Sequence, residues 1–377
     1  MPLDPFFEER LRVHRRYMFD QALGAARSRL RALWPWGRSA PAPTKDPITR
    51  TASASESKAV AKRGEPRPQP GPRARARAKH RRAALAWDRT ELRTVGLPGP
   101  DVRIAEHRVE VPGHPAVRVR IYYPDLAGAE PAENTAPVPA ALAFFGGAFR
   151  IGGIDYPTTD AGFRRRAADS GVAIAAVDYA LAPEHPFPTQ VEQAHAALEW
   201  LFARADELGI DSDRVGVAGT SAGGGIAAAL TLMNRDRLKR PLRLQVLEVP
   251  VVDLTGAHLD LRATRALGIP RLLAVRELRS VARTYLPDPT MAREPYASPL
   301  RAATHEGLPP AVILTAEYDP LRGDGDAYGA ALRRAGVNAS VVQYQGVTHD
   351  TPIFGRALPA ARRWHDDVVS ALRRLHT

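Results

Sequence analysis

The chain has 377 residues, which is enough for one large domain or two medium ones. It contains no cysteine, and this excludes disulfide bonds, thiolate zinc sites and a cysteine nucleophile. The net charge of +12 comes from the first 90 residues, where 21 Lys and Arg face 8 Asp and Glu, whereas the remainder is close to neutral. A nucleic-acid-binding domain would need a basic surface of its own, so we expect no nucleic-acid requirement.

The N-terminal sequence MPLDPFFEER lacks the apolar core of a secretory signal, and no apolar stretch has the length of a membrane span. We therefore expect a cytoplasmic protein. Apolar residues recur near helical spacing over residues 5–35, which predicts an amphipathic helix that ends at Pro35 and Gly37. This helix defines a first region, residues 1–37.

Residues 38–84 form a second region that is rich in Pro, Ala and Arg and has no periodicity. Such a composition cannot bury enough apolar surface to offset its conformational entropy, so we predict a disordered linker. A solvated spacer is the preferred interpretation. A basic arm for anionic lipid or nucleic acid is the alternative.

Residues 85–377 have the pattern of a globular domain. Strand-like runs are expected at Ile104–Val111, Val117–Tyr123, Ala140–Phe145, Val172–Val177, Arg214–Ala218, Leu244–Val249, Ala311–Thr315 and Ser340–Gln345. Helical patterns are expected at Thr159–Ser170, Thr189–Glu207, Ala222–Met233, Gly323–Ala335 and Ala357–Leu375. This alternation predicts a mostly parallel sheet with helices on both faces. Residues 251–307 interrupt the alternation with a long insertion, which is typical of a lid or cap over a site.

The strongest local motif is Gly219-Thr220-Ser221-Ala222-Gly223. It follows a predicted strand and opens a helix of small residues, which is the context of a nucleophile elbow. Gly219 and Gly223 allow the tight turn, and the helix N-terminus beside Ser221 favours developing negative charge. The motif by itself occurs often by chance, and the strand–turn–helix context makes it specific.

A nucleophilic serine needs a base and a group that orients the base. Asp319 and His349 each follow a predicted strand downstream of Ser221, in the chain order expected for an elbow serine. They are predicted as the orienting acid and the general base. Rival groups lie in the insertion or in helices, or directly beside His349: they are His258, His305, His365, His376, Asp324, Asp326 and Asp350.

Two consecutive glycines, Gly146 and Gly147, follow the strand AALAF. Their backbone N–H groups, together with that of Ala222 just after the nucleophile, can form an oxyanion hole. The alternative is that this Gly-Gly pair only makes a turn.

Several separated motifs now permit a comparison with a known family. The segments FFGGAFRIGG, VDYALAPEHPFP, GTSAGGGIAAAL, YASPL, GLPPAVILTAEYDPLRGDGDAYGAALRRAGV and GVTHD, in this order, resemble the hormone-sensitive-lipase-like esterases of the α/β-hydrolase fold. The resemblance implies an eight-stranded sheet, a helical cap from the N-terminal region and residues 251–307, and no cofactor or metal. It also implies the triad Ser221, Asp319 and His349, with Gly146, Gly147 and Ala222 as oxyanion donors.

The chain departs from the family pattern at a few positions around the pocket. Phe145 stands where the family has His, Thr220 where it usually has Asp, and Asp350 where Gly follows the catalytic His. Phe145, Phe149 and Thr220 are expected to contact the substrate. Without the hydrogen bonds of His, the loop after Phe145 is either looser, giving a slow enzyme, or fixed by packing of the ring.

The sequence thus predicts a serine carboxylesterase that hydrolyses small acyl esters through an acyl-enzyme. The alternative is a small-molecule-binding protein on the same fold that has lost turnover. Because the resemblance places a cap here, helix 5–35 is preferred as a cap element over a membrane-bound helix. Weak contact of the basic N-terminal arm with an anionic membrane and a homodimer are left open as partners.

Overall fold

A computed structural model describes residues 1–12, 72–126 and 136–377. Met1–Phe7 and Lys79–Thr377 form one compact unit, and Glu8–Ala78 form a second. Residues 5–12 are helical, whereas the remainder of the predicted helix 5–35 and most of the predicted linker lie outside the described residues.

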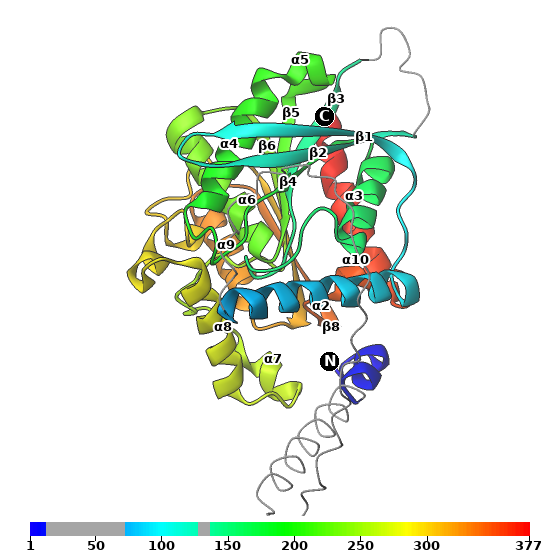
Figure 1. The fold of residues 1–377 in the computed structure, drawn as a ribbon, viewed down its shortest axis with the longest axis vertical. Helices are drawn as coiled ribbons and strands as arrows, with labels where there is room; N and C mark the ends of the chain where they lie inside the picture. Colours follow the sequence, from blue (N-terminus) through cyan, green and yellow to red (C-terminus); the bar gives the residue numbers. More distant parts are fainter. Residues whose placement is uncertain (13–71, 127–135) are drawn as a thin grey trace, which may run out of the picture. The chain divides into compact units, whose positions relative to one another are not determined.

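The larger unit is built on a single sheet of eight strands (Figure 1). In chain order the strands are β1 Val102–Val111, β2 His114–Leu126, β3 Val138–Phe144, β4 Ala173–Asp178, β5 Ile210–Thr220, β6 Leu242–Glu248, β7 Ala311–Tyr318 and β8 Ala339–Thr348. Their spatial order is β1-β2-β4-β3-β5-β6-β7-β8. Strand β2 is antiparallel to both β1 and β4, and all other neighbours are parallel. The predicted mostly parallel, eight-stranded sheet is confirmed.

Helices cover both faces of this sheet. From Pro157 onward, the helices in chain order are α3 Pro157–Ser170, α4 Thr189–Ala203, α5 Ala205–Leu208, α6 Ala222–Met233, α7 Leu261–Ala266, α8 Arg271–Tyr285, α9 Arg322–Arg334 and α10 Pro359–Arg373. Helices α3 and α10 pack together on one face, whereas α4 and α6 pack on the other. Helices α7 and α8 belong to the predicted insertion 251–307.

The core depends on small side chains, as a chain with few aromatic residues requires. Strand β3, with the sequence VPAALAF, is buried along six of its seven residues. Every residue of α6, from Ala222 to Met233, is also buried. The helix that begins at the elbow is thus enclosed on all sides by the protein, which holds its N-terminus in one position.

Helix α2, Pro72–Thr94, is not anticipated by the predicted boundaries. The predicted linker runs to residue 84, but the helix begins at Pro72, where the proline-rich sequence gives way to Ala and Arg, both good helix formers. Periodicity of apolar residues does not detect this helix, because polar side chains attach it to the protein. Arg81 forms an ion pair with Glu184 at 2.6 Å, and Asp88 accepts from Thr158. The linker prediction is therefore wrong for residues 72–84.

The first residues of the chain lie at the loop after β8. The N-terminal ammonium forms an ion pair with Glu317 at 2.8 Å, and the N–H of Asp4 donates to the carbonyl of Gly346 at 2.8 Å. Phe6 and Phe7 pack their rings on Phe354. These contacts fix the N-terminal segment beside the loop that carries His349. Among the helices within the described ranges, none has the length and apolar character needed to cross a membrane.

Candidate active site

Ser221 lies between β5 and α6 in a strained conformation, with φ 55° and ψ −116°. Positive φ is unusual for a residue with a side chain and is typical of a nucleophile elbow. A Cβ on Gly219 would come within 2.2 Å of the carbonyl oxygen of Gly223, and one on Gly223 within 2.3 Å of that of Phe144. Neither position therefore accepts a side chain, which explains the glycine spacing.

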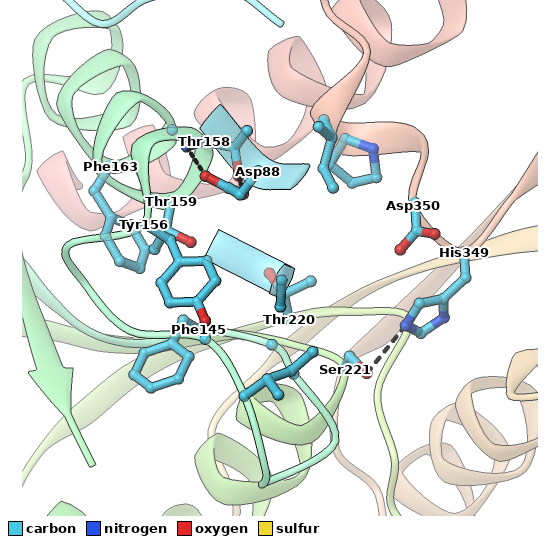
Figure 2. Close-up of a pocket in the computed structure, with 18 of the residues that line it drawn as sticks. Asp88, Phe145, Tyr156, Thr158, Thr159, Phe163, Thr220, Ser221, His349 and Asp350 are labelled. Atoms are coloured by element: carbon cyan, nitrogen blue, oxygen red, sulfur yellow. Dashed lines mark hydrogen bonds between the residues drawn. The ribbon is translucent and has the colours of Figure 1, made fainter. Parts of the chain in front are cut away.

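His349 and Asp319 complete a hydrogen-bonded chain with Ser221. Figure 2 shows the contact between His349 and Ser221. His349 follows β8, and its Nε2 lies 3.0 Å from Ser221 Oγ. Its Nδ1 lies 2.7 Å from Asp319 Oδ2. Asp319 follows β7, is 1% exposed, and accepts from the backbone N–H of Leu321 through its other oxygen. The three predicted catalytic residues thus meet at the carboxyl edge of the parallel strands.

The rival residues are engaged elsewhere or lack this geometry. His258 contacts Asp253, His305 contacts the carbonyl of Pro299, His365 contacts Asp169, and His376 contacts the carbonyl of Ser170. Asp324 is fully buried and accepts from the backbone N–H groups of Val252 and Asp253. Only His349 among these histidines contacts a serine hydroxyl in the described part of the chain.

The electrostatics of His349 favour its charged form. Burial by itself lowers the pKa of the imidazole, but the Asp319 carboxylate and, more weakly, Asp350 outweigh burial and raise it to about 9. An imidazole with a raised pKa is a strong proton acceptor, and Asp319 stabilises the imidazolium that forms when it takes a proton.

The loop after β3 lies against Ser221. A Cβ at Gly146 would lie 3.4 Å from Ser221 Cβ, which places this glycine against the serine. The loop then turns sharply: the N–H groups of Arg150 and Ile151 both donate to the carbonyl of Gly147. Within the described residues, the N–H groups of Gly146 and Gly147 donate no backbone hydrogen bond. Ala222, fully buried at the start of α6, is the third predicted donor.

Packing fixes the ring of Phe145 at the start of this loop. Its ring is 3% exposed and stacks on Tyr179, with centroids 4.1 Å apart and planes 7° from parallel. The hydroxyl of Tyr179 donates to the carbonyl of Phe145 at 2.8 Å. One tyrosine therefore holds both the ring and the backbone, and this favours the packed alternative over the loose loop.

Phe149 does not lie where the sequence predicts. It is expected to contact the substrate, but it is absent from the cavity wall, and its ring stacks on Tyr285 of α8 with centroids 3.8 Å apart. Its positive φ of 60° turns the backbone at this residue, a feature that sequence patterns do not reveal. Phe149 instead joins the loop to the insertion, as does the ion pair between Arg150 and Glu277.

A cavity of about 390 Å³ opens in front of Ser221. Phe145, Gly146, Gly147, Thr220 and His349 line it, as predicted for Phe145 and Thr220. Other lining residues, which sequence reasoning missed, come from α2, α3, α10 and their flanking loops: Ala84, Trp87, Asp88, Tyr156, Thr158, Thr159, Phe163, Arg165, Arg166, Ile353, Trp364 and His365. Figure 2 shows Asp88 and Thr158 bonded to each other across the cavity from Ser221.

Thr220, beside the nucleophile, belongs to a buried polar network. Its hydroxyl donates to Glu248 at 3.0 Å, and Glu248, 1% exposed, also accepts from Trp364 Nε1 and pairs with Arg166 at 2.8 Å. The burial of this carboxylate is compensated by a cation and two further donors, as a buried charge requires. The network joins the elbow to α3 and α10.

Comparison with known proteins agrees with this geometry. A family profile described as alpha/beta hydrolase fold matches residues 141–353. Esterase LipI of Mycobacterium tuberculosis is 35% identical over 275 residues, which cover 73% of this chain and 82% of LipI. Carboxylesterase NlhH of the same organism is 34% identical over 294 residues, which cover 76% of this chain and 88% of NlhH.

A solved structure shares the architecture over nearly its full length. The thermostable carboxylesterase EstE1, cloned from a metagenomic library, superposes with a TM-score of 0.71 at 35% identity, covering 80% of this chain and 98% of EstE1. Sequence, fold and the geometry around Ser221 thus agree with the resemblance noted in the motifs. The chain belongs to the hormone-sensitive-lipase-like esterases, hydrolases of carboxylic esters with the α/β-hydrolase fold.

Proposed function

We propose that the chain is a serine carboxylesterase that hydrolyses esters of small acyl groups through an acyl-enzyme. The observation that carries the proposal is the hydrogen-bonded chain from Ser221 Oγ to His349 Nε2 and from His349 Nδ1 to Asp319 Oδ2, at 3.0 and 2.7 Å. The names of LipI, NlhH and EstE1 support the bond class.

In the first half-reaction, Ser221 Oγ attacks the ester carbonyl while His349 Nε2 takes its proton. His349 then donates this proton to the leaving alcohol, which leaves the acyl group on Ser221. In the second half-reaction, His349 accepts a proton from water, the resulting hydroxide attacks the acyl carbonyl, and the proton returns to Ser221 as the acid departs. Asp319 remains ionised throughout and stabilises the imidazolium.

The oxyanion of each tetrahedral intermediate would be held by the N–H groups of Gly146, Gly147 and Ala222. Preorganised donors of this kind stabilise charge that develops only in the transition state. The stack of Phe145 on Tyr179 supports their preorganisation, because it fixes the backbone just before Gly146. The cavity of about 390 Å³ lies near the lower end of the range for ligand pockets, which supports small esters as substrates.

Rates on p-nitrophenyl esters of increasing acyl length test this proposal. We expect turnover to fall as the acyl chain outgrows the cavity. Ser221→Ala should reduce kcat by about 10⁴-fold or more without changing the melting temperature by more than a few degrees, since triad losses have this size. Ester binding without turnover by the unaltered protein would instead indicate the small-molecule-binding alternative.

A further inference from the structure

Arg165 of α3 stands on the wall of the same cavity as Ser221. Its Nη1 donates to the carbonyl of Leu97, a neutral acceptor. Within the described part of the chain it forms no ion pair. The arginines near it differ in this respect: Arg164 pairs with Asp160 at 2.7 Å, and Arg166 pairs with Glu248 at 2.8 Å. Arg165 is therefore the uncompensated cation of this helix.

The surroundings of Arg165 destabilise the positive charge of its guanidinium. Burial, followed by repulsion from Arg166, lowers the pKa of Arg165 to about 10, against a weak opposing effect of Asp169. The side chain is still protonated at neutral pH. A cation removed from water without a partner is unfavourable, and an anion that fits beside it would recover the lost interaction.

The acidic groups of the cavity wall do not pair with Arg165. Both oxygens of Asp88 accept from Thr158, one from its N–H and one from its hydroxyl. Asp350 follows His349 and contributes to the raised pKa of that imidazole. His365, which also lines the cavity, is bound to the exposed carboxylate of Asp169 at 2.7 Å. None of these carboxylates forms an ion pair with Arg165 in the described residues.

Arg165 and Ser221 line one cavity of about 390 Å³. A single short molecule that fills this cavity could therefore place an ester at Ser221 and a charged end at Arg165. Arginine suits a carboxylate in particular, because its planar guanidinium can donate two parallel hydrogen bonds.

We propose that Arg165 forms a carboxylate-binding subsite, and that the preferred substrates are short esters that carry a free carboxylate, such as monoesters of dicarboxylic acids. This inference rests on the proposed esterase function and names its substrate class. Hydrolysis would break the ester bond through Ser221 as described, add the elements of water, and leave the distal carboxylate unchanged on Arg165.

The test compares monoethyl glutarate and monoethyl adipate with the neutral esters ethyl butyrate and ethyl pentanoate, followed in a pH-stat. We expect a higher kcat/KM for the charged esters, through a lower KM. Arg165→Met should reduce kcat/KM for the charged esters by roughly tenfold to a hundredfold, as expected for loss of a charge-assisted hydrogen bond. The neutral esters should change by about twofold or less, since no charged partner is lost.

Two further variants control for charge and for folding. Arg165→Lys retains the charge and should restore part of the preference, whereas Arg271→Met removes an exposed arginine of α8 and should change nothing. Equal losses on charged and neutral esters in Arg165→Met, or a wild-type preference for the neutral esters, would overturn the subsite.

Binding separates this inference from the esterase proposal. Calorimetry on Ser221→Ala with monoethyl glutarate needs no turnover. The double variant Ser221→Ala/Arg165→Met should bind it roughly tenfold or more weakly, and high salt should reduce the difference. Equal affinity of the two proteins would refute the subsite even if the wild type hydrolyses neutral esters. Binding that depends on Arg165 in a protein that hydrolyses no ester would refute the esterase proposal and leave the subsite standing.

Discussion

The cavity has two walls that are built in different ways. On the wall at the sheet edge, the segments that follow β3, β5, β7 and β8 bring Ser221, Asp319, His349 and the loop of Gly146 and Gly147 together. Backbone hydrogen bonds hold this wall: Ser221 N–H donates to the carbonyl of Glu248 at 2.8 Å, and Val251 N–H donates to that of Ser221 at 3.1 Å. On the opposite wall, α2 is attached through the side chains of Arg81 and Asp88.

We expect this difference to separate residues that affect turnover from residues that affect substrate selection. The sheet edge is set by the ladder of the strands and by glycines that no other residue replaces, so changes there should affect turnover. The wall of α2 and α3 is set by individual ion pairs and hydrogen bonds, which differ easily between related chains. Changes there should affect KM and substrate preference while leaving the reaction intact.

Among changes that leave Ser221, Asp319 and His349 in place, the largest effect is expected from loosening the sheet-edge wall at Phe145. Phe145→Ala removes the stack on Tyr179 and leaves a cavity, which costs about 3–5 kcal/mol of folding stability for a buried Phe. If the loop then moves by enough to lose one oxyanion donor, kcat falls by about 10²–10³. Joint measurement of kcat and melting temperature checks this result.

Two matched variants sharpen the same prediction. Tyr179→Phe retains the stack and removes only the hydrogen bond to the carbonyl of Phe145, so its losses should be much smaller. Phe145→His buries a polar ring among apolar neighbours, and both its stability and its rate should fall. A faster and equally stable Phe145→His protein would show that packing does not fix this loop.

A moderate effect is expected from detaching the opposite wall. Asp88 accepts from the N–H and hydroxyl of Thr158 at the start of α3, as an N-cap residue does. Asp88→Ala should cost about 0.5–2 kcal/mol, the usual size for a lost cap, and raise KM with little change in kcat. Asp88→Asn keeps an acceptor and should lie close to the wild type. If Asp88→Ala lowered kcat as much as Phe145→Ala does, the expected division of roles between the two walls would be contradicted.

The smallest effect concerns the pH profile. The proposed mechanism needs neutral His349, whose pKa is raised to about 9, so kcat/KM should rise with pH as the imidazolium loses its proton. Asp350→Asn removes one of the carboxylates that raise this pKa, and the acidic limb should move to lower pH by less than one unit. An unchanged limb in this variant would mean that Asp350 does not act on His349.

The same shift affects stability with a definite sign. The folded-state pKa of His349 lies above its ordinary value of 6.5, so protonation favours the folded protein. This contribution is complete below pH 6.5 and is lost as the pH rises through about 9. Activity and this part of the stability should therefore change in opposite directions over that interval.

The two walls also differ in what the sequence could predict. Strands alternate with helices along the chain, and Ser221, Asp319 and His349 each follow a strand, so parallel-sheet geometry brings them to one edge. The family and the fold are confirmed. Roles of individual site residues stay predictions that the geometry supports.

Other features have no comparable signal in the sequence. Helix α2 packs on the protein through the polar side chains of Arg81 and Asp88. Because it lacks a periodic apolar face, its sequence pattern predicts a solvent-exposed segment. Phe149 stacks on Tyr285 of the insertion and is absent from the cavity wall, and its positive φ is a backbone feature that no sequence motif reveals. The cavity residues on α3 and α10 depend on how two helices pack against each other, which is a tertiary property.

The most direct test of the account is to identify the atom that carries the acyl group. Rapid mixing with p-nitrophenyl acetate, acid quenching and peptide mass spectrometry should give a burst of nitrophenol and an acetyl adduct on Ser221. Ser221→Ala should give neither. An acetyl group on another residue, or a burst that persists in Ser221→Ala, would contradict the assignment of Ser221 as the nucleophile.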